Sequence, residues 1–164
     1  MKTDSLKKLL VHELKDLYSA ETQLIEALPV LADKATDEGL KSAFRSHLDE
    51  TKRQRSRIEK IFKKMDFSPR GHRCKGMEGL IKETSDVVQD VDDPDVLDAA
   101  LIACAQRVEH YEMATYGSAR AYAEKLGDYD TADLLQQSLD EEGAADRRLT
   151  TLAKRRINFE AAVS

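Results

Sequence analysis

Apolar side chains recur every three or four positions over four long stretches of this chain, which is the spacing of one face of an α-helix. Local signals support two helix boundaries. Asp93-Pro94 is a helix cap followed by proline in the first turn, and Gly127 favours a helix end. A shorter amphipathic stretch lies between the second and third long ones. The pattern predicts an all-α protein with helices at about 4–33, 37–65, 75–89, 94–126 and 128–158.

Polar residues interrupt each long apolar face near its middle. Glu21 interrupts the first helix and Glu112 the third, each on the face that its apolar neighbours share. A buried carboxylate without a partner carries a large desolvation cost, so it must be protonated, paired or bound to a cation. In the second long helix the interrupting residues are His47, Thr51 and Gln54, and Glu50 lies one turn from His47. In the fourth long helix the interrupting residue is Glu142.

A shift of ninety-one positions aligns the two halves of the chain. It places Glu21 on Glu112 and Glu50 on Glu141, so each half is predicted to be a helical hairpin with acidic residues in both helices. The segment between the halves is long enough to cross the length of a bundle. The repeat and the crossover predict a ferritin-like four-helix bundle. The expected single domain, 1–164, has hairpins at 4–65 and 94–158, and a crossover at 66–93 that carries the extra short helix.

The carboxylates of such a bundle point to a metal site. Four or more of them at one level of a dry core cannot all be ionised unless cations compensate them. Two divalent ions bridged by Glu side chains would do so, and carboxylate oxygens with some imidazole suit iron or manganese. We therefore expect two iron or manganese ions per chain. For Glu21 and Glu112 the alternative is an ordinary buried ion pair.

The expected ligand pattern is only partly present. Such sites combine one Glu from each of two helices with Glu-x-x-His from each of the other two. Here the downstream His is absent, and His47 lies three residues before Glu50 instead, either as a ligand or as a hydrogen-bonded core histidine. In the fourth helix the repeat favours Glu141, whereas helical spacing favours Glu142. The candidate ligands are Glu21, His47, Glu50, Glu109, Glu112, Glu141 and Glu142.

Composition and charge narrow the function classes. The net charge is −5, with acidic and basic residues interspersed and no basic face, so we expect no binding to nucleic acid. No apolar run approaches the length of a membrane span, and the N-terminus has no signal-peptide core, so we expect a cytoplasmic protein without a membrane partner. His72-x-Cys74 has a spacing compatible with metal, but it is only two residues in a loop.

Five short segments in combination are typical of one bacterial family. They are Tyr18-Ser19-Ala20-Glu21-x-Gln23-Leu24, His47-Leu48-Asp49-Glu50-Thr51, Met77-Glu78-Gly79-Leu80-Ile81, Glu109-His110-Tyr111-Glu112 and Leu139-Asp140-Glu141-Glu142. Together they resemble the YciE/YciF family of bacterial ferritin-like proteins over nearly the whole chain. The resemblance implies a homodimer linked to bacterial stress responses, with a di-metal centre similar to that of rubrerythrin.

Three functions remain open at this point. The first is a di-iron or di-manganese oxidoreductase, similar to rubrerythrin or a ferroxidase, that reacts with oxygen or peroxide. The second is iron storage or sequestration. The third is a metal-free stress or interaction module whose acids pair with arginines such as Arg53 or Arg57. Metal content separates the third from the first two.

Overall fold

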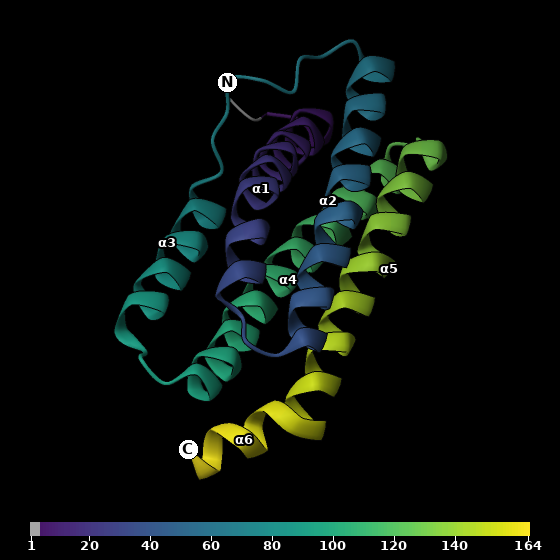
Figure 1. Ribbon diagram of the computed structural model, residues 1–164. Helices are drawn as coiled ribbons and strands as arrows, with labels where there is room; N and C mark the ends of the chain where they lie inside the picture. Colours follow the sequence, from purple (N-terminus) through teal and green to yellow (C-terminus); the bar gives the residue numbers. More distant parts are fainter. Residues whose placement is uncertain (1–3) are drawn as a thin grey trace.

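The computed structural model describes residues 4–164, which form a bundle of four long helices with a further helix along its side (Figure 1). No strand occurs in this range. The bundle helices are α1 (Leu6–Lys34), α2 (Glu38–Met65), α4 (Pro94–Lys125) and α5 (Tyr129–Leu152); α3 (Lys75–Asp90) lies beside α1 and α4.

The connections follow the ferritin-like order. Helices α1 and α2 form one antiparallel hairpin, and α4 and α5 form the other (Figure 1). The chain leaves α2 at one end of the bundle, descends through α3 and enters α4 at the other end, so α2 and α4 run in the same direction. This is the long crossover that such bundles need. The predicted fold is confirmed.

Short polar side chains begin the helices. Ser5 caps α1 and Asp128 caps α5, while Asp93 accepts two backbone N–H groups at the start of α4. Helix α1 continues past Pro29 to Lys34, because this proline is exposed and only the last turns follow it.

Two apolar clusters fill the bundle, one towards each end. Each long helix contributes to both clusters, and α1 does so through Leu17 on one side and Leu24 on the other. Glu21 lies between these two leucines and is fully buried. The polar interruptions in the other three helices fall between the same two clusters. The core therefore contains one polar level with an apolar layer above and below it.

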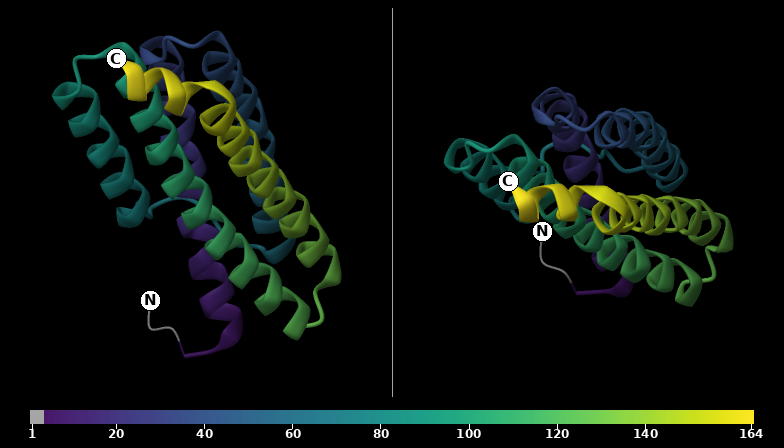
Figure 2. Two further views of the ribbon diagram at one scale, coloured as in Figure 1. Left: turned by 90° about the horizontal axis from the view of Figure 1, so that it is seen from below. Right: turned by 60° about the horizontal axis from the view of Figure 1, so that its bottom comes forward.

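The C-terminal end departs from the predicted straight helix to residue 158. After Leu152 the chain makes a π-helical turn (Ala153–Ile157), and α6 (Asn158–Val163) then crosses the end of the bundle and packs against α4 (Figure 2). A π turn changes the direction of a helix without ending it. The turn places Ile157 in the apolar cluster with 1% of its surface exposed. No helix of the described residues is both long and apolar enough to cross a membrane.

Candidate metal centre

The polar level of the core brings together acidic side chains and one histidine from all four bundle helices. Each of these side chains is held on the inward face of its helix, where the apolar residues on either side fix the helix phase. Ligand atoms of four of them lie within 4.8 Å of one another, and these four residues are His47, Glu109, Glu112 and Glu142. This buried cluster has the composition of a site that can hold a metal.

His47 presents one ring nitrogen to the cluster and the other to its edge. Nε2 lies 3.2 Å from Glu109 Oε1 and 3.7 Å from Glu142 Oε2. Nδ1 faces Glu50 Oε2 at 3.4 Å. Metal-binding histidines commonly have this arrangement, in which a carboxylate orients the ring through the nitrogen that does not bind. Glu50 therefore contacts the predicted ligand His47 from outside the cluster.

Glu21 lies next to the cluster and is oriented by a tyrosine. The hydroxyl of Tyr116, which is also fully buried, donates to Glu21 Oε1. Burial and the charges of Glu21 and Glu112 raise the pKa of this phenol well above its usual value, so it stays protonated and remains a donor. On the other side of the cluster, the side-chain amide of Gln54 donates to Glu142 Oε1.

Several buried lone-pair atoms at this level make no hydrogen bond to any described residue. Such atoms are rare in folded proteins, because an unsatisfied polar atom loses its hydration without compensation. All of them can donate a lone pair to a metal: six are oxygens of carboxylate or amide groups, and one is an imidazole nitrogen. They are Glu21 Oε2, His47 Nε2, Gln54 Oε1, Glu109 Oε2, Glu112 Oε1 and Oε2, and Glu142 Oε2.

The electrostatics of this level favour neutral acids or bound cations. Burial raises the pKa of Glu21, Glu109 and Glu112 well above the ordinary value for glutamate. The neighbouring carboxylates add to this, with Glu142 contributing in all three cases. No Lys or Arg of residues 4–164 forms an ion pair with the clustered carboxylates. Protons or metal ions must therefore balance them.

Glu50 and Glu141 lie outside the cluster, each in an ion pair with an arginine. Arg148 Nη2 is 2.7 Å from Glu50, and Arg57 binds both oxygens of Glu141 at 2.6 and 2.7 Å. The shift of ninety-one positions that relates Glu50 to Glu141 also relates Arg57 to Arg148. The two ion pairs are therefore equivalent, and each joins one half of the chain to the other.

The two adjacent acidic residues of α5, Glu141 and Glu142, have different positions in the bundle. The repeat matches Glu141 to Glu50, and both make the arginine pairs at the edge of the bundle. Glu142 is fully buried, and its counterpart in the repeat is Thr51, which is buried as well. The repeat favours Glu141 as a ligand, but Glu141 is paired with Arg57 at the edge of the bundle. Helical spacing favours Glu142, and this is the residue that lies inward.

Two residues of the site were not among the predicted ligands. The sequence indicates Gln54 only as a polar interruption of its helix, and it does not predict a role for Tyr116. The available signal for Tyr116 was its position one turn after Glu112, on the same helical face. Tyr111 is next to Glu112 in the sequence but does not orient a clustered acid, because its hydroxyl lies 3.0 Å from the sulfur of Cys74.

An apolar cavity elsewhere in the bundle is not part of this site. It has a volume of about 340 Å³, lies between α1, α3 and α4, and contains none of the clustered acids. A small hollow of about 10 Å³ does reach the cluster, between α2 and α5. His47 and Glu109 form part of its wall, and Arg148 stands at its side.

Comparison with known proteins gives the family. A family model described as a domain of unknown function, DUF892, matches residues 5–162. The chain belongs to this family. It is 42% identical over 162 residues to protein YciF of Escherichia coli K12, covering 98% of each chain. The resemblance to the YciE/YciF family is confirmed, and the chain is thereby placed among relatives of a protein described as a stress protein.

Solved structures of similar proteins have the same fold. The E. coli stress protein YciF matches with a TM-score of 0.91, covering 95% of this chain and 99% of that one. YcfI of Rhodopseudomonas palustris, 42% identical, matches with a TM-score of 0.88 over 92% of this chain and 98% of its own. A Xanthomonas campestris pv. campestris protein is only 17% identical, with a TM-score of 0.74 over 92% of each chain, and shows the fold alone.

Substitutions at two neighbouring residues of this DUF892 protein are expected to have very different effects on metal binding. We expect Glu142→Gln to lose metal binding, because it removes a charged oxygen from the cluster. Glu141→Gln should retain it and lower the free energy of unfolding by about 1 kcal/mol through the weakened Arg57 pair. Metal content after anaerobic reconstitution and urea denaturation measure the two effects. Equal metal loss in both variants would contradict this assignment.

Proposed function

We propose that the protein binds two iron or manganese ions at the polar level of its core and uses them in a redox reaction with oxygen or a peroxide. The observation that supports this most strongly is the convergence of unpartnered lone-pair atoms from four helices on one buried place. Their oxygen-rich character with a single imidazole suits iron and manganese better than metals that prefer sulfur. The proposed ligands are Glu21, His47, Glu109, Glu112 and Glu142, with Gln54 Oε1 as a further oxygen.

The chain's own residues would divide the work of holding the ions. Glu112 has both oxygens free and would offer both of them to the ions. Glu21 and Glu142 each have one oxygen fixed by a neighbour and one free, so they are oriented before a metal arrives. Tyr116 keeps its proton on the phenol oxygen and directs it at Glu21. Iron or manganese would supply electrons that no side chain of this site can supply.

The surroundings of the site support a small molecule as the reactant. The hollow that reaches His47 and Glu109 has about 10 Å³, which is close to the room of one water molecule. Two alanines, Ala43 and Ala145, line it and leave this space open, while Arg148 stands beside it paired with Glu50. Dioxygen and hydrogen peroxide are only slightly larger than water, so this narrow access favours them over larger organic substrates.

Peroxide consumption tests the proposed reaction. Protein loaded anaerobically with ferrous iron should have its iron oxidised by one equivalent of hydrogen peroxide at least about tenfold faster than free ferrous iron, which corresponds to about 1.4 kcal/mol of barrier. A ferrous-specific chromogenic chelator, added at timed intervals, measures the remaining ferrous iron. Glu141→Gln is the matched control and should react as the wild type does. Bound iron that reacts no faster than free iron would refute the redox proposal while leaving metal binding intact.

The metal-free alternative requires arginines that neutralise the buried acids. Arg57 is instead bound to Glu141, and Arg53 is exposed. These placements favour the metal-binding function.

On the family resemblance we also propose a homodimer. Light scattering should give about twice the mass of one chain, whereas a shell of many subunits would favour iron storage.

A further inference from the structure

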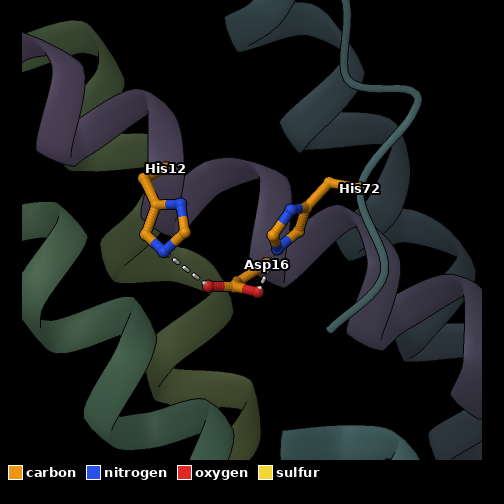
Figure 3. Close-up of side chains that lie close together, drawn as sticks. All are labelled: His12, Asp16 and His72. Atoms are coloured by element: carbon orange, nitrogen blue, oxygen red, sulfur yellow. Dashed lines mark hydrogen bonds and ion pairs between the residues drawn. The ribbon is translucent and has the colours of Figure 1, made fainter. Parts of the chain in front are cut away.

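A second group of potential metal ligands lies on the surface, away from the acidic cluster. His12 and Asp16 are one turn apart on α1, and His72 comes from the loop that leads from α2 to α3. The Asp16 carboxylate lies between the two imidazole rings (Figure 3). His72 Nε2 is 2.6 Å from Oδ1, and His12 Nε2 is 3.3 Å from Oδ2. Ligand atoms of all three residues lie within 4.8 Å of one another.

The position of His72 does not depend on its contact with Asp16 alone. The Ser19 hydroxyl accepts the backbone N–H of Cys74 at 2.8 Å, and the Gln23 amide donates to the Cys74 carbonyl at 3.1 Å. These buried hydrogen bonds hold the end of the loop against α1. The geometry that brings the imidazole of His72 next to Asp16 is therefore built into the fold, although 56 residues separate them.

The three side chains are also open to an ion from solvent. The exposed fraction of the side chain is 47% for His12, 31% for His72 and 19% for Asp16. The two rings stand at 73° to each other with their centroids 5.4 Å apart, so neither covers the other's coordinating nitrogen. Both nitrogens instead face the space around the carboxylate (Figure 3).

We infer that His12, Asp16 and His72 bind one divalent transition-metal ion, with zinc as the preferred metal. Two imidazoles and a carboxylate are three of the four ligands of a tetrahedral zinc ion, and water takes the fourth position. Zinc–ligand bonds of about 2.0–2.2 Å put neighbouring ligand atoms roughly 3.3–3.6 Å apart, so small side-chain rotations are sufficient. Magnesium and calcium prefer all-oxygen ligands and should bind weakly.

The inferred site and the buried cluster differ in their donor chemistry. The surface group has two imidazoles and one carboxylate, whereas the buried group has one imidazole among several carboxylates. An ion at the surface site would join the loop before α3 to α1, because its ligands come from both. We therefore assign it a stabilising role for this crossover, independent of the redox function proposed above.

Zinc titration of untagged protein in the Glu112→Gln background tests the site, because that background weakens binding at the buried cluster. We expect one zinc ion per chain by isothermal titration calorimetry. His12→Ala and His72→Ala should each weaken zinc binding at least about tenfold, since each removes one of three protein ligands. His110→Ala is the matched control, because His110 also contacts an aspartate, Asp146, at 3.3 Å but has no third potential ligand beside it within residues 4–164.

Cobalt provides a second readout that does not depend on the Glu112 variant. Co²⁺ in place of zinc should give the strong visible absorption of a tetrahedral site in the wild-type protein, and Asp16→Asn should abolish it. Zinc affinity that is unchanged in both His12→Ala and His72→Ala would overturn the inference. So would equal losses in His110→Ala, which would indicate unspecific binding to surface histidines. Neither result would bear on the buried centre.

Discussion

Replacing Glu112 by leucine is expected to abolish metal binding and, at the same time, to stabilise the metal-free protein. Glu112 is fully buried, and neither of its oxygens has a hydrogen-bond partner among the described residues. Losing a ligand should weaken metal binding by at least about a hundredfold, since even residues that only orient ligands are worth up to that much. Without metal, the same carboxylate is a desolvated group that leucine replaces at similar volume.

The expected gain in stability is about 1–3 kcal/mol, the cost of burying a polar group without a hydrogen-bond partner. For a chain of this length, each kcal/mol raises the Tm by about 2–4 °C. Thermal melting in the presence of a chelator measures this gain, and elemental analysis after anaerobic reconstitution measures the loss of metal. Metal should raise the Tm of the wild type but not that of the variant.

Glu26→Leu is the control for the change from glutamate to leucine in a helix. Glu26 is exposed on α1, and its replacement should change stability by no more than about 0.5 kcal/mol and leave metal content unchanged. A Glu112→Leu protein that retained full metal content would remove Glu112 from the ligand set. A large loss of stability in the metal-free variant would instead show that this carboxylate is satisfied in the fold.

The metal-free protein is expected to become less stable as the pH rises from about 5 to 8. Burial, reinforced by neighbouring carboxylates, raises the pKa of Glu21, Glu109 and Glu112 in the folded state above the value of 4.5 expected in the unfolded chain. Between those two values the folded state holds protons that the unfolded state has released. The stability contributed by these acids is complete below pH 4.5 and is lost as the pH rises through the folded-state pKa.

The size of this effect depends on how many carboxyls remain protonated. Each carboxyl that is protonated in the folded state and ionised in the unfolded state lowers the free energy of unfolding by about 1.4 kcal/mol for every unit that the pH rises. Glu50 acts in the opposite direction. Its burial raises its pKa, but the contacts with His47 and Arg148 outweigh burial and the net pKa is lowered, so its stabilising contribution is lost only in more acidic solution. The stability maximum of the metal-free protein should therefore lie near pH 5.

Urea denaturation with a chelator between pH 4 and 8 measures this profile. The double variant Glu21→Gln/Glu112→Gln should have a flatter profile, because two of the three carboxyls with raised pKa are absent. Bound metal should reverse the trend, since it requires ionised carboxylates, and the increase in Tm on adding metal should be larger at pH 8 than at pH 5.5. Wild-type stability that rises from pH 5 to 8 without metal would contradict the proposed protonation of the cluster.

The helices and the general nature of the site could be predicted from the sequence, because both depend on local spacing. Apolar residues three and four apart lie on one helical face whatever surrounds the helix. An acidic residue within such a face, as at Glu21 and Glu112, is therefore predicted to be buried. The repeat and the length of the crossover then left few ways of arranging the two hairpins.

Tertiary packing decided the features that depend on helix phase and on distant contacts. Glu141 and Glu142 differ by about 100° around α5. Helical spacing favours Glu142 and the repeat favours Glu141, and the packing of α5 against its neighbours decides between them: it directs Glu142 into the core and leaves Glu141 beside Arg57. The π turn before α6 likewise arises where the chain meets the end of the bundle.

The partners of the site residues also required the folded structure. Tyr116 meets Glu21 across 95 positions, and Gln54 meets Glu142 across 88. His72 reaches Asp16 because the crossover returns along α1. The sequence by itself determined which helices form and that acidic groups must be buried in them, since both follow from short-range geometry. Only the tertiary structure decided which side chains share the buried level, because that depends on how separate helices are rotated against one another.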